Sequence, residues 1–156
     1  MALTYEEIIQ FMTAYFPAYS NYGQDPATVH VMNDFYASDF VFTGHVGREE
    51  PVVYSGRDAF LAFDISHPSI YERLTPVEMG IDEHTGQVFA VIKFEFIDRS
   101  SDSVLTEELG ASLYQLVQDE SGKPKIKSLL FFPQRLPPGA VSGAELFQKH
   151  ATGAGS

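Results

Sequence analysis

Cysteine and tryptophan are absent from the 156 residues of this chain. Without cysteine the chain can form neither a disulfide nor a thiolate metal site, which is typical of a protein from a reducing compartment. Long hydrophobic runs are missing as well, because no segment approaches the roughly 18 uninterrupted apolar residues of a membrane span. The N-terminal residues show no basic region followed by an apolar run. We therefore expect no signal peptide and a cytoplasmic location.

Basic side chains are scarce compared with acidic ones. Ten lysines and arginines stand against 21 aspartates and glutamates, and the formal net charge is −11. A polyanion is repelled by phosphate backbones and anionic lipid surfaces, so we expect no nucleic-acid partner and no membrane partner. The five histidines are scattered without the paired spacing of a metal site, and no phosphate-binding glycine motif is present. The sequence therefore predicts no metal and no cofactor.

The first half of the chain predicts helices around one short strand. Residues 4–7 fit a capping box, and apolar residues then recur at helical spacing as far as Pro17, which should kink the helix or end it near Phe16. Asp25-Pro26 is a strong start signal for a second helix. The further elements expected here are an apolar strand over 39–44, an edge strand over 51–54 and a third helix over 58–67.

The second half predicts a sheet of long antiparallel strands. Turn residues at 83–86 and 120–123 separate apolar stretches, which is typical of hairpins. Gly110, within the longest stretch, is the candidate for a β-bulge. The length predicts one domain over residues 1–136, followed by a C-terminal extension over 137–156 that is partly disordered. Strands are expected over 74–82, 87–98, 104–119 and 125–132, and a short helix over 144–150.

The middle strands are apolar on both faces. Leu109, Ala111 and Leu113 share one face of their strand, while Tyr114 and Leu116 share the other. A sheet with one face in water should instead alternate between apolar and polar residues. The helices can cover only one of the two faces, so the pattern predicts a homodimer that forms through the sheet.

This order of elements resembles the cone-shaped α+β superfamily of nuclear transport factor two, ketosteroid isomerase and the SnoaL-like polyketide cyclases. The resemblance covers about residues 4–133 and rests on short echoes at 35–42 with 46–47, at 55–60 and at 121–123. It implies a curved antiparallel sheet wrapped around three helices, with a central cavity. A fold of this kind implies a pocket more than a particular chemistry.

The family's catalytic residues are only partly matched. Ketosteroid isomerases carry a general-base aspartate at the end of the first strand, where this chain has Gly44, so the neighbouring His45 would have to replace it. Their second acid lines up with Ser112, and their oxyanion tyrosine matches Tyr15. SnoaL-like cyclases typically end the last strand with a catalytic aspartate, and residues 130–134 contain none.

Three further polar positions each have two interpretations. His45 lies at the expected mouth of the cone and is either a general base or a loop histidine in solvent. Asp64 and His67 are one helical turn apart. They either form an oriented histidine–carboxylate pair, or His67 ends the helix and its charge complements the helix dipole. Glu108 points either inward or toward a solvated rim.

Two functions follow from these patterns. The first is a small-molecule pocket protein, a cofactor-independent isomerase, dehydratase or cyclase of an uncharged or anionic hydrophobic ring compound, with His45 and Tyr15 as catalytic residues. The second is a non-catalytic dimeric module for ligand binding or protein interaction, whose cone is filled by its own aromatic side chains. The residues expected to bind the substrate are Tyr19, Phe40, Phe42, Phe63, Phe94, Ser112, Tyr114 and Leu130.

Overall fold

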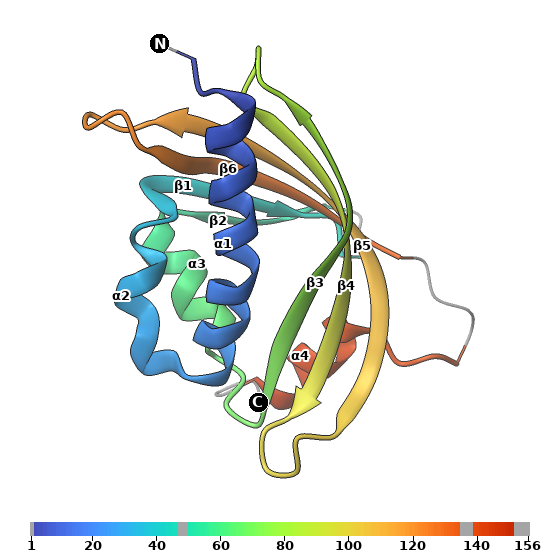
Figure 1. Ribbon diagram of the computed structural model, residues 1–156. Coiled ribbons are helices and arrows are strands. Elements are labelled where there is room, and N and C mark those ends of the chain that lie inside the picture. Colours follow the sequence, from blue (N-terminus) through green and yellow to red (C-terminus); the bar gives the residue numbers. More distant parts are fainter. Residues whose placement is uncertain (1, 47–49, 135–138, 152–156) are drawn as a thin grey trace.

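A curved six-stranded sheet forms the frame of the protein, and helices lie in its hollow (Figure 1). The computed structural model describes residues 2–46, 50–134 and 139–151. The strands lie in the order β2-β1-β6-β5-β4-β3, and the α+β cone predicted from the sequence is confirmed. The elements are α1 (Tyr5–Gln24), the 3-10 turn η1 (Pro26–Thr28), α2 (Val29–Met32), β1 (Tyr36–Gly44), β2 (Val52–Ser55), α3 (Arg57–Asp64), β3 (Ile70–Asp82), β4 (Gln87–Asp98), β5 (Val104–Gln118), β6 (Pro124–Pro133) and α4 (Gly143–His150).

The sheet is mixed rather than antiparallel throughout. Hairpins join β3, β4, β5 and β6, which pair antiparallel as expected. β1 and β6, in contrast, run parallel. Parallel neighbours need a long connection, and here β2, α3 and the three strands before β6 supply it. The hairpins determine the direction in which β6 runs. β1, which comes much earlier in the chain, runs in that same direction.

Helix α1 continues past Pro17, so the helix end predicted near Phe16 is wrong. The capping box at its start is present, with Thr4 accepting from the amide of Glu7 at 3.2 Å. Proline cannot bond the carbonyl one turn earlier, that of Thr13, but both residues are exposed and water can hydrate this carbonyl. The opposite side of α1 is buried against the sheet, and this packing holds the helix together.

Gly110 marks a place where two rings from the neighbouring strands pack over β5, and not the predicted bulge. It stays in register with both neighbouring strands, and the register shifts of β5 lie near its two ends. A Cβ atom at this position would lie 2.6 Å from the ring of Phe131 and 2.8 Å from the ring of Phe94. Only glycine lets these two rings pack over the strand.

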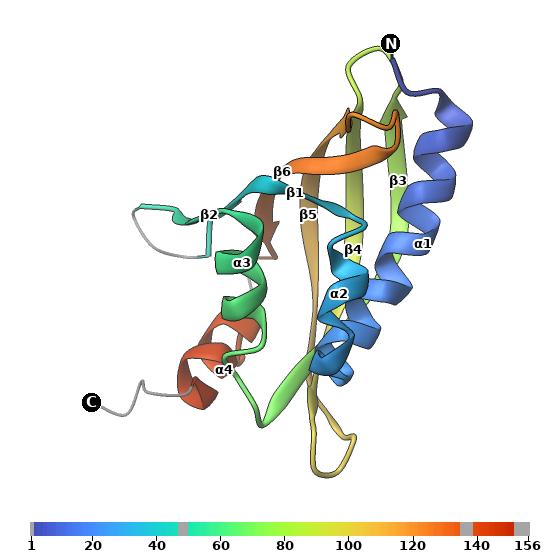
Figure 2. The same ribbon diagram turned by 90° about the vertical axis from the view of Figure 1, so that its left-hand side faces the viewer.

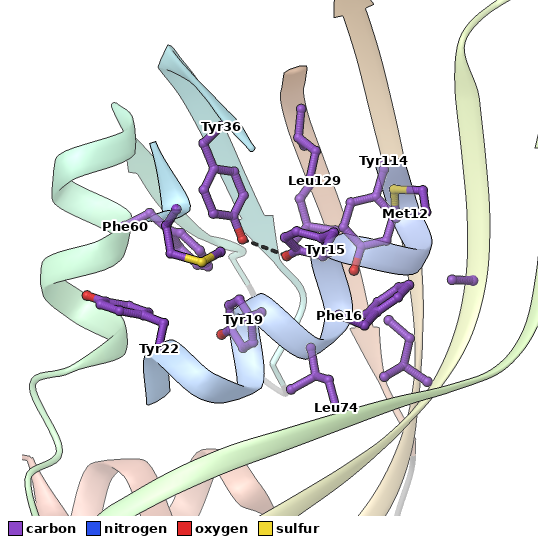
Figure 3. Close-up of a cluster of buried hydrophobic side chains, with 14 of the residues drawn as sticks. Met12, Tyr15, Phe16, Tyr19, Tyr22, Tyr36, Phe60, Leu74, Tyr114 and Leu129 are labelled. Atoms are coloured by element: carbon purple, nitrogen blue, oxygen red, sulfur yellow. Dashed lines mark hydrogen bonds between the residues drawn. The ribbon is translucent and has the colours of Figure 1, made fainter. Parts of the chain in front are cut away.

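The core lies between α1 and the concave face of the sheet (Figure 3). Met12, Tyr15 and Phe16 from α1 meet Tyr36 from β1 and Tyr114 from β5, and all five side chains are fully buried. None of the helices within the described ranges is long and apolar enough to cross a membrane.

Helix α4, which falls within the predicted C-terminal extension, packs beside α3. The two helices lie together at the end of the molecule away from the N-terminus (Figure 2). The ring of Phe147 on α4 stacks on that of His67 with centroids 4.2 Å apart. Residues 152–156, most of the tail predicted to be disordered, lie outside the described residues.

Candidate functional site: an acidic, aromatic cavity

A cavity of about 680 Å³ lies between α1, α3, α4 and the concave face of the sheet. Its volume falls within the roughly 300–1,000 Å³ that is common for small-molecule sites. The apolar part of the wall is mostly aromatic and includes Phe42, Phe60, Phe63, Phe94, Phe131 and Phe147. The polar part includes Asp64, His67, Glu72, Glu108, Ser112 and Glu145.

Two carboxyl groups meet at the hydroxyl of Tyr19. This hydroxyl, from α1, lies 2.6 Å from Oδ1 of Asp64 at the end of α3 and 3.2 Å from Oε1 of Glu72 on β3. It carries one proton, so it donates fully to one carboxyl group at a time. Asp64 and Glu72 also hydrogen-bond each other. Two ionised carboxylates this close repel each other, which favours a state in which one of the pair holds a proton.

The electrostatics of the pair assign that proton. Burial raises the pKa of Asp64 from 3.8 to about 6, although the hydrogen bonds from Tyr19 and Glu72 lower it. Burial, followed by the charge of Asp64, raises the pKa of Glu72 well above its ordinary value. Asp64 therefore ionises first as the pH rises, and Glu72 keeps its proton longer because the charge of Asp64 lies beside it. A proton acceptor and a proton donor thus lie side by side in one cavity.

Contacts of α1 with α3 and β3 hold the three side chains in position. The hydroxyl of Tyr22 donates to the carbonyl oxygen of Leu61 in α3 at 2.8 Å. The amide of Leu74 in β3 donates to Oγ of Ser20 at 3.0 Å. Helix α1 also lies close to β3 at Gly23, where a Cβ atom would be in van der Waals contact, 3.4 Å from the backbone oxygen of Glu72. The acid pair is thus built on rigid elements and not on a loop.

Glu108, a third carboxyl group, connects β5 to α4. Its side chain faces the cavity, as one of the two sequence interpretations expected, and Oε2 accepts from the amide of Gly143 at 3.1 Å. Burial raises the pKa of Glu108, and the bond from Gly143 lowers it in part. Gly143 itself has no room for a side chain, because a Cβ atom would lie 1.9 Å from the ring of Phe96.

His67 lines the cavity without pairing through its ring with the Asp64 carboxylate. Its ring lies between Phe147, which stacks on it at 4.2 Å, and Phe63, which meets it edge-on at 5.2 Å. Burial lowers the pKa of His67, so the ring is neutral at physiological pH. The hydrogen bond between these two residues involves the backbone of Asp64, and the carboxylate turns to Tyr19 and Glu72 instead.

A group of hydroxyls borders the same cavity. Tyr15 and Tyr36 share a hydrogen bond of 2.6 Å, drawn in Figure 3. The ring of Tyr114 meets that of Tyr15 edge-on, with centroids 5.7 Å apart. Burial raises the pKa of Tyr15 well above its ordinary value, so its hydroxyl is a neutral donor and not an anion.

The structure brings most of the predicted binding residues together. Tyr15 and, among the eight residues expected to bind substrate, Tyr19, Phe42, Phe63, Phe94, Ser112 and Tyr114 line the cavity. Phe40 lies outside its wall and packs in the core against Tyr36 and Phe60. Leu130 is also outside, because its neighbour Leu129 is the residue that pairs with Tyr114 and shares its face. The prediction for Leu130 is therefore wrong by one residue, because neighbouring side chains on a strand point to opposite faces of the sheet.

His45 does not reach the cavity wall. It is exposed at the end of β1, and its ring stacks on that of Phe132 with centroids 4.8 Å apart. The direction of a side chain that follows a strand cannot be read from alternation, which is why the sequence could not exclude this placement.

Glu72 is the residue of the acid pair that the sequence analysis missed. Ile70, Glu72 and Leu74 alternate along β3, and all three are buried. A glutamate that shares the parity of buried apolar residues was the available signal. It was missed because the strand was expected to begin at residue 74, four residues later than it does. In the part of the chain that the structure describes, no cluster of three acidic or histidine side chains could hold a metal ion.

Comparison with known proteins supports the fold. No family model matches the sequence, and no curated protein matches it. Nuclear transport factor 2 from Cryptosporidium parvum aligns over 83% of this chain and 93% of its own, with a TM-score of 0.61 and 11% identity. A ketosteroid isomerase-like protein from Erwinia carotovora atroseptica aligns over 84% and 93%, with a TM-score of 0.52 and 17% identity.

A third solved structure is an LEH-like epoxide hydrolase from M. tuberculosis. It aligns over 83% of this chain and 79% of its own, with a TM-score of 0.56 and 18% identity. Sequence identities this low support a shared fold, and they do not support a shared chemistry. The chain has the nuclear transport factor 2-like fold that ketosteroid isomerase-like structures share.

Proposed function

We propose that the protein is a cofactor-independent acid–base enzyme, an isomerase, dehydratase or cyclase, which acts on a hydrophobic ring compound bound in the cavity. The observation that carries the proposal is the hydrogen-bonded pair of Asp64 and Glu72 at the hydroxyl of Tyr19. Carboxyl groups with raised pKa values in a cavity are a recurring feature of catalytic sites. Side chains alone supply every group that such chemistry needs.

The proposed roles follow from the protonation states. Asp64, with a pKa of about 6, is ionised at neutral pH and can accept a proton from a substrate carbon. Glu72 and the hydroxyl of Tyr19 then stabilise the pair as the proton arrives. Tyr15, whose hydroxyl borders the same cavity, can donate a hydrogen bond to a substrate oxygen on which charge develops. This assignment moves the role of base from His45 to Asp64.

The dimer of the alternative function, a binding module without catalysis, is supported by a different feature. The convex face of the sheet exposes Phe89, Leu109 and Phe132 to solvent, with 50%, 42% and 45% of their surfaces accessible. An apolar face of this kind supports a homodimer through the sheet. A dimer is compatible with either function. The two functions therefore differ in whether the protein converts a bound ring compound. The cytoplasmic location rests on the lack of cysteine in the sequence.

Deuterium exchange tests the catalytic proposal directly. A panel of cyclic ketones in D₂O, followed by NMR, should show enzyme-dependent exchange of the protons next to the carbonyl group. Asp64→Asn should slow this exchange by roughly 10²–10⁴-fold, the usual contribution of a positioned general base. His45→Ala serves as the control, because its side chain lies outside the cavity, and should keep the full rate. Exchange that depends on His45 and survives Asp64→Asn would reverse the assignment.

A further inference from the structure

Glu108 has an unused oxygen at the cavity. The residue is only 5% exposed, and Oε2 accepts from the amide of Gly143. The described residues give its carboxylate no other hydrogen-bond donor. Among the described residues, every fully buried polar side-chain atom has a hydrogen-bond partner. The other oxygen of Glu108 has none among these residues, so it is not fully buried, and it borders the cavity that Glu108 lines. A carboxylate that is nine-tenths buried and borders a cavity with one free acceptor can take a hydrogen bond from a ligand that displaces water.

Aromatic side chains line the cavity on the same side as this carboxylate. Phe94 on β4 lies directly across from Glu108 in the antiparallel ladder, so both side chains project from the same face. The ring of Phe131 meets that of Phe94 with centroids 5.1 Å apart, and Phe96 packs against Gly143, the residue that donates to Glu108. Faces of aromatic rings attract cations, most strongly where water is excluded.

The charge of the wall as a whole has one sign. Asp64, Glu72, Glu108 and Glu145 come from four different elements, and the described lining residues include no lysine or arginine. Burial and then the charge of Asp64 are the main causes of the raised pKa of Glu72, and the negative charge of Glu108 adds a smaller contribution. An anionic ligand would add to this repulsion, whereas a cationic ligand would relieve it.

From these observations we infer that the cavity takes a hydrophobic amine, with the ring among the phenylalanines and the protonated nitrogen bound to Glu108 beside Phe94 and Phe96. This inference names the substrate class of the proposed function and therefore rests on it. It replaces the uncharged or anionic ring compound that the aromatic content alone suggested. In this arrangement Glu108 holds the ligand, and the Asp64–Glu72 pair is free to move protons.

Three probes with one ring system and different head groups test the inference. The affinities of 2-naphthylmethylamine, 2-naphthalenemethanol and 2-naphthoate for the full-length protein are measured by calorimetry at pH 7.5. The amine should bind at least about tenfold more tightly than the alcohol, and the carboxylate should bind most weakly. An alcohol or carboxylate that binds as tightly as the amine would overturn the inference, and so would the absence of binding by the amine.

A matched pair of variants on β5 tests the position. Glu108→Gln should remove the preference for the amine and leave the affinity for the alcohol within about twofold, because only the charge is lost. Glu107→Gln is the control, since Glu107 is the exposed neighbour on the same strand. A preference that persists in Glu108→Gln would overturn the role of Glu108. The probe series on the unmodified protein keeps its meaning even if that variant does not fold. Deuterium exchange in Asp64→Asn measures the proposed catalysis separately, so either idea can fail alone.

Discussion

Replacing Asp64 with asparagine should stabilise the protein at neutral pH and change its stability little near pH 4. The carboxyl group has a pKa of about 6 in the folded protein, against 3.8 as its ordinary value, mainly because it is buried. Between these two pH values the folded state therefore holds more protons than the unfolded state. Its free energy of unfolding falls as the pH rises through this window. Asparagine has no charge to lose, so it does not share this fall.

The size of the effect follows from the same shift. A difference of about two pH units corresponds to about 3 kcal/mol when the penalty is complete, above about pH 7. About half of it remains at pH 5 and a small part at pH 4. Relaxation of the site reduces the full value to about 1–3 kcal/mol, or a rise of about 3–9 °C in Tm for a protein of this size. The amide of asparagine can still accept from Tyr19 and donate to Glu72.

Urea unfolding at pH 4, 5 and 8 measures this difference. The control is Asp58→Asn on the same helix, where the side chain is 89% exposed, and its effect should not change between pH 5 and 8. If Asp64→Asn were destabilising at pH 8 by as much as at pH 4, the ionised carboxylate of Asp64 would not lower the stability of the folded protein. The argument for its role as a base would then lose its electrostatic support.

The remaining predictions concern the sheet. Gly110→Ala should cost about 1–3 kcal/mol in the free energy of unfolding, measured in urea, because its methyl group would clash with the rings of Phe131 and Phe94. The unmodified protein should sediment at about twice the monomer mass at micromolar concentration. Leu109→Glu or Leu113→Glu should yield monomers or aggregates. A protein that stays monomeric at high concentration would contradict the homodimer.

Local signals in the sequence predicted most of the elements. The capping box at Thr4 and the cap at Asp25 are present in the structure, because each depends on hydrogen bonds within a few residues. The hairpin turns were found for the same reason, and they fixed the order of β3 to β6. At Pro17 the same kind of argument predicted either a kink or a helix end, and the helix end is wrong. Whether a proline ends a helix depends on the packing of the opposite face, which local sequence does not contain.

The residues of the site could be predicted where side chains alternate along a regular strand. The prediction failed where such alternation does not apply. Tyr114 and Ser112 were placed correctly because their strand is long and regular. Leu130 was misplaced by one residue, which is enough to move a side chain to the other face. Glu72 depends on where β3 begins, and its meeting with Asp64 depends on how α1 lies across two other elements. No spacing in the sequence relates residues 19, 64 and 72.

The acid pair is difficult to explain as a structural feature alone. Glu72 lies among buried apolar residues, and a glutamine there could keep a hydrogen bond to Tyr19 without the burial of an ionisable group. Asp64 lowers stability at neutral pH for the reason given above. Proteins retain such destabilising groups mainly where they serve a function. Three substitutions therefore distinguish a functional role of these acids from a purely structural one. Asp64→Asn and Glu72→Gln should raise stability at neutral pH and slow catalysis, whereas Glu108→Gln should change the choice of ligand.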